Sequence, residues 1–509
     1  MKTSIAWMTK RAAFAALLCA VAPAFAASQV TAHAVSHVFL VQNSGWMDPF
    51  FTDPASQYKP LVTELVMAAT QPGDLMVLAS FNQSLPGAPS PKAMLSLKVN
   101  TDPASVRRDV GAALAGLQTA KKPGSAALAD TDLGEAVSSA LSQALAGKPG
   151  LVWLFTNNRN SPNNDQATAL RNREFYTLIH QGGTITRALA FPLKMPVQGA
   201  HYRANGLMVY VFAVGDIGAR ELDRLLASGR VQRVITEPPA RLKPLDRDTV
   251  RLVPRRVDEA PGVSFSMGPG GMLRADVDQD ARTPAAKIGW NLENTMYPYT
   301  IVSARVTARS KLAGQDQPIA LAGDTVKALA PGKSAPLESR MQLPVAQLPG
   351  KWSAKAIGSA GSAYVMPGQI ELQLTEQRLE LSQAFRQRKA ALFPGDPYPE
   401  IFTPPERIHG STALLPIEVR VHYGIGPLAA LIGAGLVLAG ALGGAALAYG
   451  RPRRAFLTVE DELRTVHTRA GVTQPIFDKG GNKVAQLKTT IFGHQLIDLR
   501  EGAQVRLGR

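Results

Sequence analysis

Residues 428–448 constrain the fold of this chain more than any other stretch. They carry no charged side chain, and about 20 such residues are enough to cross a bilayer as a helix. Three arginines follow directly: Arg451, Arg453 and Arg454. The positive-inside rule places these arginines in the cytoplasm. We therefore expect a transmembrane helix over 425–449, with residues 28–423 outside the cytoplasm and the C-terminus inside.

The N-terminus is typical of a secretory signal peptide over residues 1–26. A basic start precedes an apolar run over 12–21 and the cleavage site Ala24-Phe25-Ala26. Cys19, the one cysteine of the chain, lies within this segment. The mature chain would hold no cysteine, which excludes disulfides, thiol catalysis and cysteine-ligated metals. A signal peptide implies the same orientation as the arginines, and an uncleaved N-terminal anchor is the alternative.

The net charge is +16 over 509 residues. Because most basic residues would lie outside the cytoplasm, we do not expect a nucleic-acid partner. Anionic lipid headgroups or acidic envelope polymers fit a basic exterior face better, and scattered solvated charge is the simplest alternative. The length allows about three domains of roughly 150 residues each.

Residues 36–228 alternate between apolar strand-like runs and helical spacing. We expect strands at 38–41, 75–81, 151–156, 185–192 and 207–214, and helices at 57–70, 105–120, 132–145, 174–181 and 219–227. Thr131 is placed to cap the helix that starts at Asp132. Repeated alternation of this kind predicts a mostly parallel, doubly wound α/β sheet.

Four segments of this region resemble von Willebrand factor A domains. Residues 38–47, VFLVQNSGWM, are similar to the first strand and the metal loop, whose family pattern is Asp-x-Ser-x-Ser. Residues 72–81 resemble the second strand, 131–136 (TDLGEA) the threonine-bearing helix start, and 153–158 (WLFTNN) the strand that normally ends Leu-Thr-Asp-Gly. The resemblance implies a von Willebrand A-like domain over 36–228.

The residues at the family's metal positions depart from the pattern. Gln42 stands at the first Asp, Ser44 at the first Ser, Trp46 at the second Ser, Thr131 at the Thr and Asn157 at the distal Asp. Mg²⁺ needs oxygen ligands that usually include a carboxylate. Since both carboxylates are replaced by amides, we expect no metal and no cofactor.

The same positions could serve a different purpose. We expect Gln42, Asn43, Ser44, Trp46, Thr131 and Asn157 to form a metal-free surface that binds an envelope protein, with Trp46 as its anchor. The alternatives are a core tryptophan, a plain helix cap at Thr131 and a strand-ending turn at Asn157. Asp48, Asp130 and Asp132 could instead supply displaced ligands to a cation.

The pattern changes after residue 228. Residues 229–261 read as a basic linker. Short alternating runs then predict an immunoglobulin-like β-sandwich over 262–423, with strands at 263–267, 272–277, 286–292, 300–308, 354–357 and 417–421, interrupted by a helix at 379–392.

The tail, residues 450–509, reads as a small cytoplasmic domain. We expect a helix at 459–466, then strands at 475–477, 483–487, 489–492 and 495–499, with Gly480-Gly481 turning the first hairpin. About 60 residues make only a small core. Within the span, Gly440 and Gly444 follow a small-xxx-small pattern that favours a homo-oligomer, although glycine is common in alanine-rich spans.

The sequence gives no support for an enzyme. It lacks His-Glu-x-x-His, a phosphate loop and a Gly-x-Ser-x-Gly elbow, and Ser44 has no identifiable base. We therefore expect a protein of the bacterial inner membrane whose periplasmic domains recognise or scaffold envelope proteins. The alternatives are a cation-dependent adhesion module, a transmembrane signalling module and an envelope hydrolase with an unrecognised site.

Overall fold

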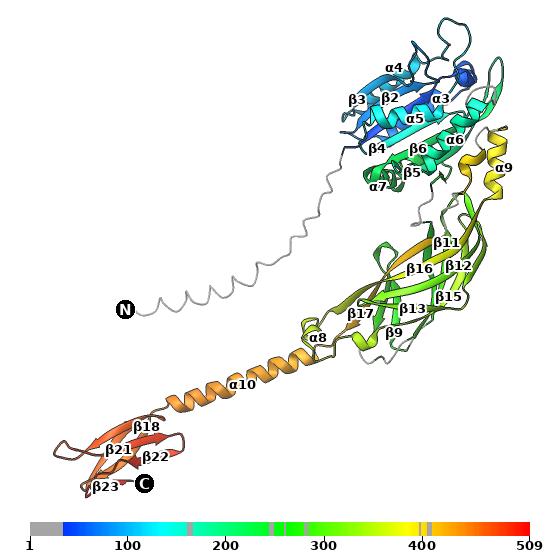
Figure 1. The fold of residues 1–509 in the computed structure, drawn as a ribbon. Coiled ribbons are helices and arrows are strands. Elements are labelled where there is room, and N and C mark those ends of the chain that lie inside the picture. The colour runs from blue at the N-terminus through cyan, green and yellow to red at the C-terminus, as the bar shows by residue number, and fades with distance from the viewer. Residues whose placement is uncertain are drawn as a thin grey trace.

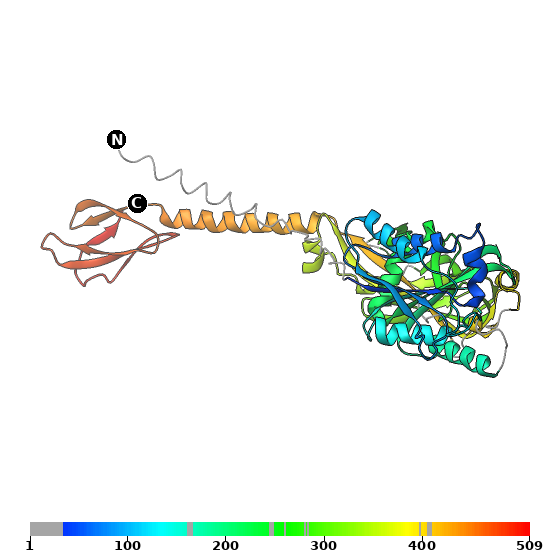
Figure 2. The same ribbon diagram turned by 90° about the horizontal axis from the view of Figure 1, so that it is seen from above.

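The computed structural model describes residues 34–159, 166–243, 249–258, 261–278, 281, 285–395, 399–404 and 410–508. The signal peptide expected over 1–26 lies outside them. The described residues form an α/β domain, a second domain of β-strands, one long helix and a small β domain, in that order (Figure 1). Seen from above, the long helix is a rod between the two larger domains and the tail (Figure 2).

The α/β domain is built on one seven-stranded sheet with the order β3-β2-β1-β4-β6-β5-β7. β1 pairs in parallel with β2 and with β4, as the strand–helix alternation predicts. β6, however, runs antiparallel to both β4 and β5. The strands are β1 (Ser36–Gln42), β2 (Leu75–Phe81), β3 (Lys92–Lys98), β4 (Gly150–Thr156), β5 (Ile185–Gln198), β6 (Arg203–Val214) and β7 (Ala240–Arg241).

The prediction of a mostly parallel sheet is therefore wrong, because the sheet contains both parallel and antiparallel pairs. β5 and β6 extend toward each other until only a short turn separates them, closed by the Gly199 amide, which donates to the Tyr202 carbonyl at 3.0 Å. A parallel connection needs a crossover of a dozen or more residues, whereas a short turn produces an antiparallel hairpin. The apolar pattern hides this extension because Pro196 falls in an irregularity of β5 between Lys194 and Val197.

Helices cover both faces of this sheet. α3 (Tyr58–Ala69), α4 (Pro103–Ala115) and α7 (Gly215–Ala227) bury their apolar faces on one side, and α5 (Leu133–Ser139) and α6 (Gln166–His180) on the other. Phe39 of β1 faces the first layer and Leu40 the second, so successive side chains of this central strand enter opposite cores. A strand buried on both faces reads as a continuous apolar run, as β1 does.

The segment expected as a basic linker, 229–261, belongs to both large domains. β7 adds to the α/β sheet, and β8 (Val250–Asp258) is a strand of the second domain. The Arg230 guanidinium donates to the carbonyls of Met67 (2.9 Å) and Thr70 (2.6 Å) at the end of α3. A cation there satisfies carbonyls that the helix leaves unpaired, so this basic residue has a structural role.

The second domain is built on one ten-stranded sheet with the order β8-β11-β15-β13-β12-β16-β17-β10-β9, and β14 pairs with β12. β13 pairs with β12 over residues 315–319 and with β15 over residues 320–321. The strands share one core, to which Trp290, Ile301 and Leu374 contribute. The strands are β9 (Val263–Met267), β10 (Leu273–Val277), β11 (Ala285–Asn294), β12 (Tyr299–Leu312), β13 (Gln315–Leu321), β14 (Thr325–Leu329), β15 (Ser334–Gln342), β16 (Ala363–Leu381) and β17 (Ser411–His422).

Two short segments of this domain differ from expectation. Residues 354–357, expected as a strand, begin the helix α8 (Ala354–Gly358), because the Ser353 hydroxyl accepts from the Ala356 amide at 3.2 Å and caps it. The helix expected at 379–392 begins later, as α9 (Gln383–Leu392), after β16 has ended. Ser382 caps α9 through the Phe385 amide.

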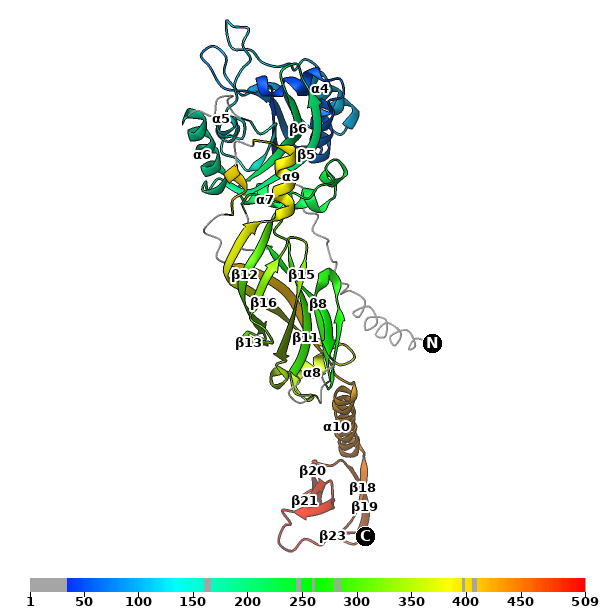
Figure 3. The same cartoon turned by 90° about the vertical axis from the view of Figure 1, so that its right-hand side faces the viewer.

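Helix α9 joins the two large domains, as Figure 3 shows. Phe385, Leu392 and Phe402 are buried in the core under α5 and α6. Arg388 donates to the Pro192 carbonyl at 3.1 Å and pairs with Glu237 at 2.8 Å. The α/β domain is therefore packed against the second domain.

The long helix is α10 (Gly426–Gly450). Residues 426–447 have a mean hydropathy of 2.0 and are long and apolar enough to cross a membrane, and no residue in the most apolar part of this helix is buried inside the protein. At 1.5 Å per residue, its 25 residues extend about 37 Å. A Cβ at Gly440 or Gly444 would meet nothing within 4 Å, so dimerisation through this face stays a prediction.

The tail folds as two three-stranded sheets around a small core that includes Leu457, Ile476 and Leu487. The helix expected at 459–466 is wrong: Glu460 and Asp461 form a tight turn with positive φ angles of 50° and 63° between β18 and β19. The turn expected at Gly480-Gly481 joins β20 to β21. The strands are β18 (Arg453–Val459), β19 (Glu462–Thr468), β20 (Thr473–Phe477), β21 (Lys483–Thr490), β22 (Gly493–Ile497) and β23 (Val505–Leu507).

Candidate functional site

The expected site residues lie together at the carboxyl ends of β1 and β4. The two strands are parallel neighbours and end at the same edge of the sheet, which is where open α/β sheets place ligands. The loop before α5 reaches the same edge because the Gly45 amide donates to the Ala129 carbonyl at 2.8 Å. This contact brings Thr131 beside Gln42 and Ser44.

The side-chain amide of Gln42 is the centre of the site. Its Nε2 donates to Ser44 Oγ at 2.7 Å and to Thr131 Oγ1 at 2.9 Å. Its Oε1 accepts from the Asn157 backbone amide at 3.2 Å, which fixes the orientation of the amide. The Thr131 hydroxyl donates to Ser44 Oγ at 2.6 Å. All three side chains have no exposed surface, so they position the loops above them.

This arrangement does not fit Mg²⁺. A cation needs the lone pairs of Ser44 and Thr131, but the Gln42 Nε2 directs its hydrogens at those oxygens. Hard cations also require carboxylate or carbonyl oxygens, and the described residues contain no group of three His, Cys, Asp or Glu that could hold a metal.

The three aspartates that could supply displaced ligands have other partners. Asp48 accepts weakly from the Thr119 hydroxyl at 3.5 Å. Asp130 pairs with Lys122 at 2.7 Å. Asp132 accepts from the Glu135 backbone amide at 2.9 Å, which makes it the N-cap of α5. The expectation that Thr131 caps this helix is therefore wrong, and its hydroxyl is free to join the buried network.

The asparagines brace the loops around the network. Asn43 donates to the Gln118 carbonyl at 3.2 Å and accepts from the Asn82 side chain at 3.1 Å. Asn157 donates from Nδ2 to the Trp46 carbonyl at 2.5 Å and so links the end of β4 to the loop after β1. Both are nearly buried, at 9% and 5% exposure. Their part is to hold the backbone of the loop that carries Trp46.

Trp46 is the expected site residue with a partly exposed side chain. Its ring meets the Tyr202 ring edge-on at a centroid distance of 5.2 Å. The Arg159 guanidinium lies 5.0 Å from the ring centroid of Trp46, an attractive arrangement of a cation over a π-face. We call Trp46, Tyr202 and Arg159 the aromatic rim.

Sequence reasoning missed two members of this rim. Tyr202 lies in the turn between β5 and β6, where burial raises the pKa of its phenol above the ordinary value and keeps it neutral. Arg159 also donates to the Pro394 carbonyl at 3.3 Å, just beyond α9. No local pattern marks Tyr202, because the turn that holds it shows no marked hairpin signal, and Arg159 is one of many arginines.

Ser44 has no base among the partners of its hydroxyl. Its oxygen accepts from an amide and from another hydroxyl, Gln42 and Thr131. Neither group takes up a proton near neutral pH, so this geometry offers no activated nucleophile.

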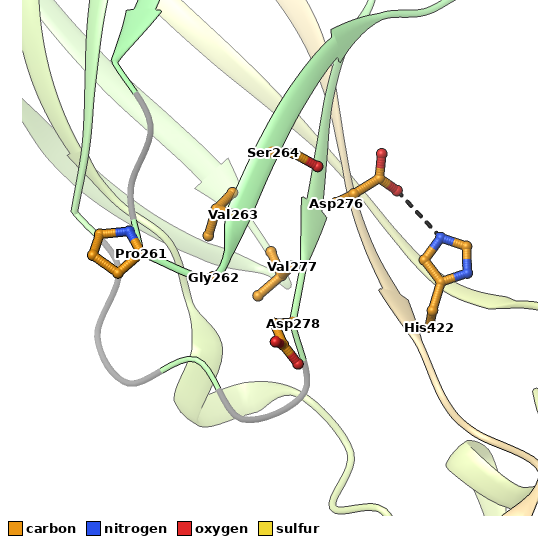
Figure 4. A pocket seen from close by; sticks show the side chains of 8 residues that line it. All are labelled: Pro261, Gly262, Val263, Ser264, Asp276, Val277, Asp278 and His422. Atoms are coloured by element: carbon orange, nitrogen blue, oxygen red, sulfur yellow. Dashed lines mark ion pairs between the residues drawn. The ribbon is translucent and has the colours of Figure 1, made fainter.

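A hollow lies in the second domain, between β9, β10 and the end of β17 that precedes α10 (Figure 4). Asp276 and His422 form an ion pair across it at 3.4 Å, and Arg420 lies 3.6 Å from the same carboxylate. The hollow is wide and open to solvent. It is lined by Pro261, Gly262, Val263, Ser264, Asp276, Val277, Asp278 and His422.

Comparison with known proteins does not identify a relative. No family model matches the chain, and no curated protein matches it. Among solved structures, CfaE, the adhesive subunit of the CFA/I fimbria of enterotoxigenic Escherichia coli, aligns with 47% of this chain and 73% of its own at 9% identity. The TM-score is 0.11, and a likeness of this size carries no argument about fold or function.

Proposed function

We propose that this chain is a membrane-anchored protein of the bacterial envelope whose α/β domain recognises a protein partner through the aromatic rim. α10 would hold it in the inner membrane, with the two large domains in the periplasm and the tail in the cytoplasm. The partly exposed Trp46, fixed between Tyr202 and Arg159, is the observation that carries the proposal. Tryptophan, tyrosine and arginine are the residues enriched at the energetic centres of protein interfaces.

The buried network supports this proposal by making the rim rigid. The loop that carries Trp46 is tied down at its start by Gln42 and through its own carbonyl by Asn157. A rim that is ordered before binding loses less conformational entropy on association. Recognition would be independent of divalent cations, since hydrogen bonds hold the loop where the von Willebrand A pattern would use an ion.

Chemical crosslinking in membranes followed by pull-down of the full-length protein tests the proposal. Trp46→Ala should lose a discrete partner that the wild type captures. Trp352→Ala is the matched control, because Trp352 is a 61% exposed tryptophan on the second domain, far along the chain from the rim. Hydrogen exchange of β1 and β4 in both variants would verify that the α/β domain stays folded.

The possible outcomes separate the domains. Loss of the partner in Trp46→Ala alone supports the aromatic rim. Retention of the partner in Trp46→Ala, with loss in Trp352→Ala, would assign recognition to the second domain and refute the rim. Retention in both variants would refute it as well.

A further inference from the structure

The tail places two large apolar residues at the tip of a hairpin. Thr490 pairs with Gly493 at the end of the β21–β22 ladder, so Ile491 and Phe492 form a two-residue loop. Two-residue hairpin loops favour Asn, Asp and Gly, which adopt the required backbone conformations at low cost. Phe492 is 94% exposed and Ile491 is 41% exposed. Neither the turn nor the small tail core accounts for these side chains.

This tip lies next to the point where the chain leaves α10. Arg453, three residues beyond the last residue of the helix, donates to the carbonyls of Thr490 (3.1 Å) and Ile491 (2.9 Å). Three residues span at most about 11 Å. The tip is therefore held within a short distance of the helix end.

The acidic residues of the tail are confined to one of its two ends. The ladders define the ends: Arg453 pairs with Thr468 at the end near α10, and Val459 pairs with Glu462 at the far end. The acidic residues of the tail all lie in the turns and connections away from α10, where exposed basic residues accompany them and Lys479 pairs with Glu462 at 3.1 Å. The end near α10 carries exposed basic residues and no acidic one. The acidic residues are Glu460, Asp461, Glu462, Asp478, Asp498 and Glu501; the exposed basic residues among them are Lys479, Lys483, Arg500 and Arg506, and those near α10 are Arg451, Arg454, Arg469 and Lys488.

We propose that the end of the tail bearing Ile491 and Phe492 docks onto the anionic lipid surface of the leaflet that holds the C-terminal end of α10. Phe492 would insert at the boundary between the headgroups and the acyl chains, while the basic residues contact lipid phosphates. α10 is about 37 Å long, longer than the roughly 30 Å of hydrocarbon in a bilayer. Its last turn, and with it the tip, therefore lies in the headgroup region.

The lipid surface fits this end of the tail better than a protein partner does. A cytoplasmic leaflet carries negative charge that attracts basic segments close to a span, and the acidic residues lie at the opposite end. Aromatic and aliphatic side chains on a basic face are typical of surfaces that lie in the membrane interface. This inference goes beyond partner recognition at the aromatic rim and rests on the proposal that α10 spans the membrane.

A fluorescent probe at the tip tests the docking in the full-length protein. Cys19 is the one cysteine of the chain, so a Cys19→Ala background allows single labelling with an environment-sensitive dye. Phe492→Cys places the dye at the tip, and Glu501→Cys places it at the far end as the matched control. Both proteins are reconstituted into phosphatidylcholine vesicles with and without phosphatidylglycerol, and some vesicles also carry spin-labelled lipid.

We expect both labelled proteins to float with the vesicles. The dye at 492 should show blue-shifted emission that spin-labelled lipid quenches, more strongly with phosphatidylglycerol, and the dye at 501 should show neither effect. Equal emission at both positions would overturn the docking. A blue shift at 492 without lipid quenching would mean contact with protein and would overturn it too. Failure to float would refute the anchor itself, and the docking with it.

Discussion

Replacing Gln42 by glutamate is the sharpest test of the buried amide network. The two side chains have nearly the same shape, but glutamate cannot donate the hydrogen bonds that Nε2 makes to Ser44 (2.7 Å) and Thr131 (2.9 Å). The position has no exposed surface. A carboxylate there would be desolvated without a cation beside it, so burial should raise its pKa above the usual value of about 4.3.

The sign of the pH effect follows from proton binding. Below about pH 4 the glutamate is protonated in both the folded and the unfolded state, so ionisation costs nothing. Above that pH the unfolded state releases the proton while the folded state retains it, and stability falls by about 1.4 kcal/mol per pH unit. Buried glutamates reach a pKa of about 8 to 9. The free energy of unfolding should therefore be about 3–4 kcal/mol lower at pH 7 than at pH 4, relative to wild type.

Hydrogen exchange of the full-length protein in detergent micelles measures this locally. Amides of β1 and β4 in Gln42→Glu should exchange roughly several hundredfold faster than those of the wild type at pH 7, and the difference should shrink toward pH 4. Gln42→Met is the matched control: it loses the same two donated hydrogen bonds, about 1 kcal/mol each, without a pH-dependent difference. A flat profile for Gln42→Glu would show that the hydroxyls turn to stabilise the carboxylate, and would refute the reasoning.

Three further substitutions test packing, capping and a buried base. Gly218→Ala should lower the free energy of unfolding by about 1–3 kcal/mol in thermal or urea unfolding, because its Cβ would lie 2.5 Å from the Gly150 carbonyl oxygen. Gly111→Ala is the control: its Cβ would meet nothing within 4 Å, so the change should be neutral or slightly stabilising. Asp132→Ala should cost about 1 kcal/mol and speed exchange in α5; an unchanged helix would contradict its role as N-cap. Desolvation lowers the pKa of His37 from 6.5 to about 4. The free energy of unfolding should therefore fall by about 3 kcal/mol as the pH falls from 6.5 to 4. His37→Phe should remove this pH dependence, measured as hydrogen exchange of the β1 amides.

Patterns that depend on local spacing predict this chain well. The apolar strands around the site, the helices that cover them and α10 all lie where periodicity places them, because burial on two faces of a sheet leaves a continuous apolar run. The prediction of a helix at 459–466 in the tail also rested on local spacing, and it is wrong. The spacing of Val459, Leu463 and Val466 suits a helix face, but Glu460 and Asp461 adopt positive φ angles and reverse the chain. Periodicity alone does not separate a short helix from a tight hairpin.

Pairing partners are harder to predict because they depend on contacts distant in sequence. The apolar content of β5 and β6 is clear, but their direction is set by a turn at Gly199 that shows no marked hairpin signal. The same limit applies to the site. Gln42 is hydrogen-bonded to Ser44 and Thr131, two of the residues expected beside it. Tyr202 reaches Trp46 only because β6 runs back beside β4.

The buried amide and the packing of α9 act on the same loop. Gln42 and Asn157 hold the loop after β1 through hydrogen bonds to Ser44 and to the Trp46 carbonyl. Arg159 covers the Trp46 ring and also donates to the Pro394 carbonyl beyond α9, so the second domain restrains the rim from the side. An ion-dependent loop changes its order with the supply of cation, whereas a loop held by neutral hydrogen bonds is ordered whenever the domain is folded. If the rim binds a partner as proposed, the loop would be ordered without a cation, and the hydrogen bond from Arg159 to the Pro394 carbonyl would link the cation over Trp46 to the second domain.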